Sequence, residues 1–190
     1  MRSRWVKNDV PFNQAWAGPI PYVAERERRG GSGGPPRMKD HRMYDARLAE
    51  LTFELERQLA DYWHEIDTNG GRDAGSYYTD DGVFHGQMAS YEGRAKIQQF
   101  YDWRVAQGPR LAVHSFTNFR AWFTGEDSAE SSCYLFLYAA NGVKILPTHA
   151  PITISMATDK YRRVDGRWLC TVRRFEHWFE GDTPITNPKL

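Results

Sequence analysis

The sequence has few cysteines, no long apolar run and almost no net charge, and each absence excludes a class of protein. Cys133 and Cys170 are its two cysteines, and their spacing is not that of a zinc site. Each lies between apolar residues of a predicted strand, so we expect two buried free thiols rather than a disulfide.

Membranes and nucleic acids are not indicated as partners. There is no run of about 18 apolar residues and no secretory signal sequence, so we expect a soluble protein located in the cytoplasm. The formal net charge of +1 gives no strong electrostatic attraction to nucleic acid or to an anionic membrane.

Local motifs for metals and cofactors are missing as well. The six histidines form no His-x-x-x-His pair and no spacing typical of two histidines and a carboxylate on one metal. A glycine-rich segment, 29–34, precedes a helix, but no strand leads into it, as a phosphate-binding loop requires. We therefore expect neither a metal ion nor a cofactor.

Aromatic residues, in contrast, make up 14% of the chain and include seven tryptophans. Such side chains fill cores and also line pockets for apolar ligands. Residues 1–43 carry four aromatic residues among prolines and end in a Gly/Pro-rich linker. We expect this segment to be an arm that lies across the main domain or a partner subunit, with disorder as the alternative. Residues 181–190 form a tail.

The first half of the main domain predicts helices. Residues 44–66 place one apolar stripe on a helix, made of Leu48, Leu51, Leu55, Leu59, Tyr62, Trp63 and Ile66. A turn at 67–71 is predicted to end this helix. A short helix at 72–78 and a short strand at 82–88 follow, and Ser90 is the expected cap of a third helix that Gly108 and Pro109 stop.

The second half predicts four long strands. Residues 111–123 and 129–140 flank a turn, and 151–164 and 167–179 flank Asp165-Gly166, a strong hairpin signal. Helices followed by antiparallel strands predict an α+β fold, with the helices packed on one face of a curved sheet.

This order resembles the nuclear transport factor 2-like superfamily, and in particular its SnoaL-like branch, over residues 44–180. The matching segments are Tyr-Trp-His-Glu-Ile-Asp at 62–67, Tyr-Tyr-Thr-Asp-Asp-Gly-Val-Phe at 77–84, Gly-Arg-Ala-Lys-Ile-Gln-Gln-Phe at 93–100, His-Ser-Phe-Thr-Asn at 114–118 and the hairpin at 159–168. The resemblance implies a cone-shaped antiparallel sheet, closed by N-terminal helices around a deep pocket. It also implies homodimers or homotrimers formed through the exposed sheet face.

Two residues are the first candidates for catalysis. Asp67 continues the buried stripe through positions 59, 63 and 67, which directs its carboxylate toward the pocket end of the core; capping of the next turn is the alternative. His114 and Asn118 share one strand face with Phe116 between them. The resemblance to bile-acid and scytalone dehydratases implies a His114–Asp67 dyad that Asn118 supports, with Tyr62 holding a substrate oxygen.

Further candidates lie on the strands. Either Arg173 or Arg174 must face inward, and the resemblance aligns Arg173 with a pocket arginine; an ion pair with Asp159 or Glu176 is the structural alternative. Two further sets of residues are expected to line the pocket or to pack in the core. One is the alternating aromatic set Tyr134, Phe136 and Tyr138 on one strand, and the other is Tyr78 and His85 on an earlier segment. His177 and Trp178 are expected at a subunit interface.

Three functions follow as hypotheses. The first is a cofactor-independent dehydratase or isomerase for a small, hydrophobic, oxygenated and cyclic substrate, with catalysis by His114, Asp67, Tyr62 and Arg173. The second is a non-catalytic ligand-binding or scaffold protein, such as the β subunit of a ring-hydroxylating dioxygenase. The third is an epoxide hydrolase, which needs Asp67, Arg173 and Asp159 around one water. Ala157, where the family often has tyrosine, alters the expected pocket.

Overall fold

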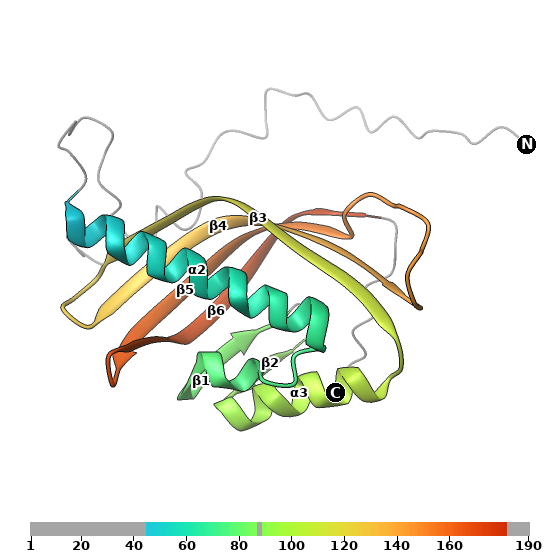
Figure 1. Ribbon diagram of the computed structural model, residues 1–190, viewed down its shortest axis with the longest axis horizontal. Helices are drawn as coiled ribbons and strands as arrows, with labels where there is room; N and C mark the ends of the chain where they lie inside the picture. Colours follow the sequence, from blue (N-terminus) through green and yellow to red (C-terminus); the bar gives the residue numbers. More distant parts are fainter. Residues whose placement is uncertain (1–44, 87–88, 182–190) are drawn as a thin grey trace, which may run out of the picture. The chain divides into compact units, whose positions relative to one another are not determined.

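The computed structural model describes residues 45–86 and 89–181 (Figure 1). The predicted arm at 1–43 and the tail beyond residue 181 lie outside these residues. The elements follow the order α2 (Ala46–Asn69), η1 (Ala74–Tyr77), β1 (Tyr78–His85), β2 (Ser90–Glu92), α3 (Arg94–Ala106), β3 (Arg110–Phe123), β4 (Ser128–Asn141), β5 (Thr153–Val164) and β6 (Arg167–Glu180). Within the described ranges, no helix combines the length and the hydrophobicity that a membrane crossing needs.

Helix α2 forms where the apolar stripe predicts it, but it continues to Asn69. The Asp45 carboxylate accepts a hydrogen bond from the Arg47 N–H at 3.1 Å, which satisfies one of the free donors at the helix start. Gly70, with a φ of 72°, ends the helix, and its N–H bonds to the carbonyl of Glu65. Asp67 therefore lies in the last turn of α2 rather than in the predicted turn after it.

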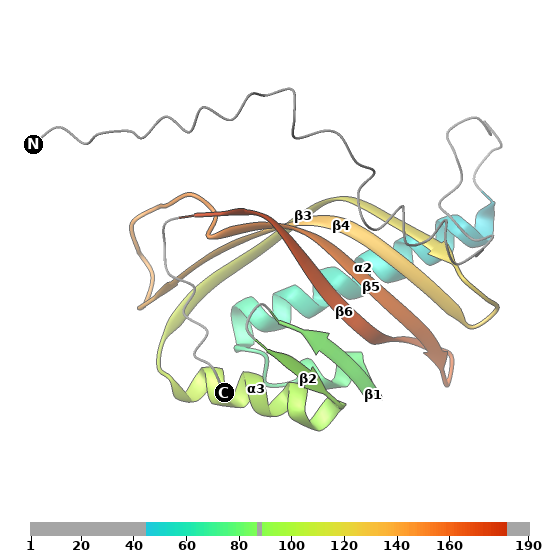
Figure 2. The ribbon, with the colours of Figure 1, turned by 180° about the vertical axis from the view of Figure 1, so that it is seen from behind.

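All six strands form one sheet in the order β2-β1-β6-β5-β4-β3. The β3–β4 and β5–β6 hairpins pair as predicted, and Asp165 and Gly166 both take the positive φ of a tight hairpin turn. Strand β1 pairs with β6 in parallel and with β2 in antiparallel orientation, which the sequence did not predict. Figures 1 and 2 show α2 lying across one face of this curved sheet, with α3 near the β1–β2 end. The fold is α+β, as predicted.

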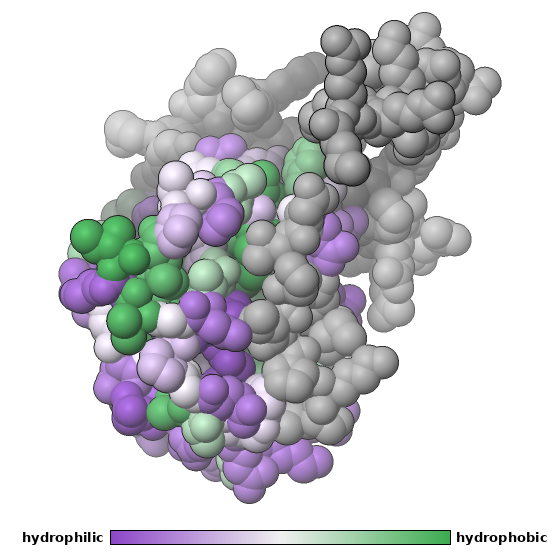
Figure 3. All heavy atoms as spheres, turned by 90° about the vertical axis from the view of Figure 1, so that its right-hand side faces the viewer, coloured by the Kyte–Doolittle hydropathy of each residue, from purple (hydrophilic) through white to green (hydrophobic). Residues whose placement is uncertain are grey.

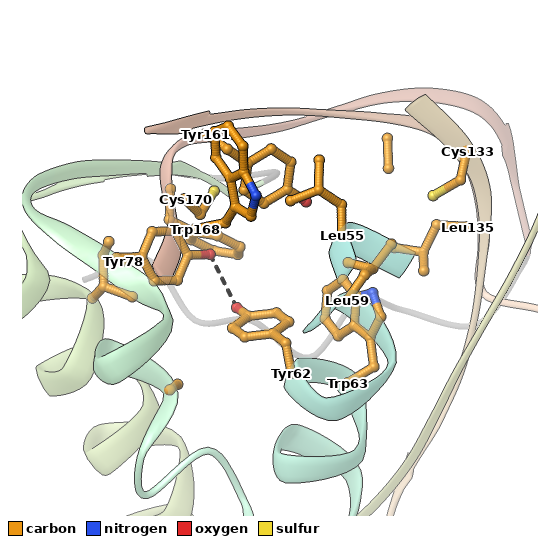
Figure 4. Close-up of a cluster of buried hydrophobic side chains, with 14 of the residues drawn as sticks. Leu55, Leu59, Tyr62, Trp63, Tyr78, Cys133, Leu135, Tyr161, Trp168 and Cys170 are labelled. Atoms are coloured by element: carbon orange, nitrogen blue, oxygen red, sulfur yellow. Dashed lines mark hydrogen bonds between the residues drawn. The ribbon is translucent and has the colours of Figure 1, made fainter. Parts of the chain in front are cut away.

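The hydrophobic core lies between α2 and the sheet. Leu55, Leu59, Tyr62 and Trp63 of the helix meet Leu135 and other strand residues there (Figure 4). Full burial of one leucine side chain contributes roughly 1.5–3 kcal/mol to folding, so this stripe fixes the helix on the sheet.

Both cysteines are buried and free, which confirms the prediction for Cys133 and Cys170. Burial raises the pKa of the Cys133 thiol to about 12, and it raises the pKa of Cys170 further. Thiols with such high pKa values stay protonated and unreactive at neutral pH. The role of the two cysteines is therefore packing.

Helix α3 begins later than predicted. Ser90 lies in β2, where its hydroxyl bonds to Nδ1 of His85 at 2.8 Å, so it does not cap the helix. The residue before α3 is Gly93, with a φ of 91° that a glycine adopts without strain. The helix buries Ile97, Phe100 and Tyr101 against the sheet end, on the side that the sequence predicted.

Candidate active site

A cavity of about 510 Å³ lies among α2, α3 and the sheet. Its walls are mainly apolar and include Ile66, Phe84, Phe100, Val105, Ala112, Leu135, Leu137 and Phe175. Exposed residues at 68, 69, 108 and 109 form its rim. Cavities of this size and character suit small, largely apolar ligands.

Asp67 and His114 meet in the wall of this cavity. The ring Nδ1 of His114 lies 2.6 Å from Asp67 Oδ1, and the backbone N–H of His114 donates to Asp67 Oδ2 at 2.7 Å. The two side chains are 11% and 16% exposed, so water screens this pair only partly. The last turn of α2 and the strand β3 thus bring together two residues that are 47 positions apart in the chain.

This geometry fixes the protonation of the neutral imidazole. A carboxylate only accepts hydrogen bonds, so Nδ1 of His114 carries the proton and Nε2 carries the free lone pair. The Trp63 ring stacks on the imidazole, with 4.0 Å between the ring centroids and 11° between the planes. Asp67 and Trp63 together hold His114 in one tautomer and one orientation, as a general base requires.

A chain of three phenols reaches the cavity from the core. Tyr78 donates to the Tyr62 hydroxyl at 3.1 Å, and a hydrogen bond of 2.6 Å joins the Tyr62 and Tyr101 hydroxyls. Figure 4 shows Tyr62 and Tyr78 pointing toward each other. Burial raises the pKa of Tyr62, and it raises those of Tyr78 and Tyr101 well above 10, so all three are neutral donors at pH 7.

Tyr101, rather than Tyr62, is the member of this chain that lines the cavity. Tyr62 is fully buried and lies behind it, as does Tyr78. The expectation that Tyr62 and Tyr78 contact a ligand directly is therefore corrected. Desolvation and aromatic packing in the core, rather than access to the cavity, account for their positions.

Arg173 faces inward but is committed to Asp159. Its Nε lies 3.0 Å from both carboxylate oxygens, and its Nη2 lies 2.7 Å from Oδ2. Burial alone would lower the pKa of Arg173, but the Asp159 carboxylate raises it well above its ordinary value. The guanidinium carbon lies 4.0 Å from the centroid of the Tyr62 ring.

This ion pair corrects two expectations. Arg173 does not line the cavity, so the structural alternative, a salt bridge with Asp159, describes it. The three residues expected for an epoxide hydrolase also do not surround one water site. Arg173 and Asp159 pair with each other, while Asp67 pairs with His114.

The aromatic residues of β4 lie on the other face of the sheet. Leu135 and Leu137 line the cavity, and successive strand residues point to opposite faces. Tyr134, Phe136 and Tyr138 therefore point away from it, which corrects their predicted role. The Tyr134 ring instead contacts Trp178, with 5.3 Å between the ring centroids.

Three further candidates do not reach the cavity. Asn118 is exposed, with a φ of 55°, at an irregularity in the β3–β4 pairing that breaks the alternation from His114. Phe116 packs against the core and contacts Phe119. His85 bonds to Ser90 instead of entering the pocket. Asn118 therefore does not support His114, because the irregularity turns it to the solvent.

Several cavity residues were not predicted. His177, which was expected at a subunit interface, lines the cavity, and its buried Nδ1 has no hydrogen-bond partner within the described ranges. The alternation of His177 with Arg173 and Phe175 on β6 could have indicated its position, because all three residues share the inner face of the sheet. Arg104 and Arg110 also line the cavity, at the end of α3 and the start of β3. Across the described part of the chain, no group of three or more His, Cys, Asp or Glu side chains is placed to hold a metal ion.

A curved sheet with helices around a cavity agrees with the architecture of the nuclear transport factor 2-like superfamily. Within this superfamily, the chain belongs to the SnoaL-like domain family, which it matches over residues 48–174. No curated protein sequence matches the chain.

Solved structures share the fold. One, named "Putative Scytalone Dehydratase", comes from Novosphingobium aromaticivorans; it is 18% identical with a TM-score of 0.64, over 76% of this chain and 95% of that one. A "putative aromatic ring hydroxylase" from the same organism is 20% identical, with a TM-score of 0.60, over 69% and 91%. A cystatin-like protein of unknown function from Nostoc punctiforme is 16% identical, with a TM-score of 0.53, over 66% and 89%. At these identities the likeness concerns the fold alone.

Proposed function

We propose that the protein is a cofactor-independent dehydratase or isomerase acting on a small, hydrophobic, oxygenated and cyclic molecule. The observation that carries this proposal is the His114–Asp67 pair in the wall of a largely apolar cavity. The similarity in fold to a protein named for scytalone dehydratase agrees with it.

His114 is the acid–base residue in this proposal. Its Nε2 takes a proton from a carbon next to a substrate carbonyl, which leaves an enolate and an imidazolium. The Asp67 carboxylate stabilises the imidazolium through Nδ1, and Trp63 stacks on it. The same Nε2–H then protonates a departing hydroxyl, which releases water and forms the double bond, or returns the proton to another carbon, which moves the double bond.

Tyr101 is the proposed donor to the enolate oxygen. If Tyr78 donates to Tyr62 and Tyr62 to Tyr101, the Tyr101 O–H is left to donate to a ligand. The charge of Arg173, next to the Tyr62 ring, polarises this chain toward the cavity. Arg173 and Tyr62 are thus positioning residues, and Tyr101 is the group that touches the substrate.

The scaffold hypothesis predicts a cavity filled by aromatic side chains. Phe116 packs elsewhere, Phe136 faces outward, and a volume of about 510 Å³ remains between the helices and the sheet. The likeness to a protein named as an aromatic ring hydroxylase keeps this hypothesis as the second candidate. A stable complex with a larger iron-bearing subunit would favour it.

Exchange of α-protons tests the catalytic proposal before the natural substrate is identified. Cyclic steroid, terpenoid and aromatic ketones are incubated with the protein in D₂O, and deuterium incorporation is followed by NMR. We expect exchange with the unchanged protein, and none above background with His114→Ala. His64→Ala, an exposed position on α2, is the matched control and should keep the rate. Equal exchange by the His114→Ala protein would rule the assignment out.

The outer sheet face is the proposed contact between subunits of a homodimer or homotrimer. Val113, Tyr138 and Trp178 on this face are 40–48% exposed, and the neighbouring β4–β5 connection exposes Val143 and Ile145 further. Figure 3 views the side on which this connection lies and shows hydrophobic side chains gathered there. Exposed apolar surface of this extent is typical of an interface. Light scattering should give a dimer or trimer mass, which Val113→Lys should lower.

A further inference from the structure

The cavity contains more positive than negative charge. Three arginines, Arg72, Arg104 and Arg110, line it together with one carboxylate, Asp67. Asp67 accepts two N–H groups of His114 and is not available to an arginine. The whole chain has a net charge of +1, so this excess is a local feature of the cavity.

Two of these arginines have no acidic partner among the residues that the structure describes. Arg72 donates to the Asn69 carbonyl at 2.6 Å, so its position is explained within the protein. Arg104 and Arg110 form no ion pair within residues 45–86 and 89–181, and Arg110 makes only a long contact of 3.5 Å to the Asn141 side-chain oxygen. Charged groups that are partly removed from water need a partner or a ligand.

The charge of Arg104 also acts on Arg110. Burial, and then the charge of Arg104, lowers the pKa of Arg110 to about 10. Burial likewise lowers the pKa of Arg104. Two guanidinium groups that are desolvated together repel each other, and an anion bound between them relieves this repulsion.

The positions of the two arginines separate them from His114. Arg110, Ala112 and His114 alternate on the inner face of β3, so the Cα atoms of Arg110 and His114 are about 13 Å apart at the usual rise of a strand. Arg104 and Arg110 flank Gly108 and Pro109 of the rim, whereas His114 is only 11% exposed. Ala112, the residue between, has a small side chain that leaves room for a ligand body.

We propose that Arg104 and Arg110 form an oxyanion-binding subsite, and that the ligand is an apolar molecule with a carboxylate or phosphate at one end. The anionic end lies at the rim between the two guanidinium groups. The apolar body extends over Ala112 toward His114, where the reacting carbon lies if the proposed function holds. The anion fixes the orientation of the ligand in the cavity.

Binding measurements test this subsite without any turnover. Three ligands share one apolar body: 2-naphthoate, 2-naphthyl phosphate and the neutral methyl 2-naphthoate. Calorimetry of the full chain should show at least one of the two anions binding tenfold or more tightly than the ester. The better of the two identifies carboxylate or phosphate as the preferred oxyanion. The preference should shrink in 0.5 M NaCl, because salt screens exposed charges.

Arg104→Gln and Arg110→Gln should each remove most of the preference for the anion and leave ester binding unchanged. Arg120→Gln, an exposed position on the same strand, is the matched control and should keep the preference. Either glutamine variant should unfold at the same temperature as the unchanged protein or at a higher one, because it removes a repulsion.

Equal binding of both anions and the ester, an equal loss of all three ligands in the glutamine variants, or no binding of either anion would overturn the proposal. His114→Ala separates this inference from the catalytic one. That variant should lose proton exchange and retain the anion preference, so each proposal can fail alone.

Discussion

Arg173 and Asp159 face each other directly on the adjacent strands β6 and β5, and their side chains are both 3% exposed. The Asp159 carboxylate also accepts a hydrogen bond from Tyr161 at 2.9 Å. The two charges thus neutralise each other inside the core, although the buried Nη1 of Arg173 has no hydrogen-bond partner among the described residues. The Arg173 guanidinium also lies over the Tyr62 ring.

Replacing only one member of this ion pair should destabilise the folded protein. Arg173→Met leaves the Asp159 carboxylate buried without its counter-ion, and we expect a loss of roughly 3–5 kcal/mol in the free energy of unfolding. The double variant Arg173→Met/Asp159→Leu should recover a large part of it, because no charge is then left buried. Urea denaturation measures both. Lys160→Met, which breaks the partly exposed Lys160–Glu130 pair, should cost less than about 1 kcal/mol. Equal losses in the single and double variants would contradict this account.

Asp67→Asn should impair catalysis while the fold persists. The new amide can accept the His114 backbone N–H, but its NH₂ group then faces Nδ1 and forces the proton onto Nε2. The wrong tautomer should lower kcat about 10²- to 10⁴-fold. Proton exchange and thermal unfolding measure the two effects. Asp61→Asn, at an exposed site on the same helix, should leave the exchange rate unchanged. A rate for Asp67→Asn close to that of the unchanged protein would mean that Asp67 does not orient the imidazole.

The buried phenols should limit stability in alkali. Burial raises the pKa of Tyr62, Tyr78 and Tyr101 above 10 in the folded protein, whereas the unfolded chain ionises near 10. The unfolded state therefore loses protons first, and stability falls as pH rises above 10 toward the folded pKa values. Below pH 10 this contribution is fully present. Urea midpoints from pH 8 to 11.5, with phenolate absorbance at 295 nm, measure this. Ionisation of every tyrosine near pH 10 without unfolding would be inconsistent with it.

Filling the cavity should abolish ligand binding and preserve the fold. Ala112→Phe places a ring between Arg110 and His114, in space that is otherwise free for a ligand. Val113→Phe adds the same ring on the opposite face of β3, where Val113 is 48% exposed. Titration with the naphthalene ligands should show no binding for the first variant and ordinary binding for the second. Retained affinity in Ala112→Phe would place the ligand elsewhere.

Patterns of one residue type at a fixed spacing were reliable guides to the elements. The apolar stripe predicted α2, and the turn at Asp165-Gly166 predicted the β5–β6 hairpin. The parallel pairing of β1 with β6 could not be predicted in this way, because it joins segments about 90 residues apart and depends on a register that no local pattern encodes.

The residues of the candidate site were likewise predicted only in part. His114 and Asp67 were found because helix period, strand period and family resemblance all indicated them. The β4 aromatics and Asn118 were misplaced, because strand alternation shows which residues share a face but not which face is inside, and one irregularity reverses it.

By itself, the sequence determined the helices, the long strands and the α+β class, because these depend on periodicity and residue chemistry. Together with the family resemblance, it also indicated the two residues that meet as the His114–Asp67 pair. Only the tertiary structure decided that Arg173 is held by Asp159, that Tyr101 and not Tyr62 meets the cavity, and that Arg104 and Arg110 both line it. Such outcomes depend on which groups from distant segments lie within a few ångströms of each other in a desolvated interior, and spacing along one chain does not contain that distance.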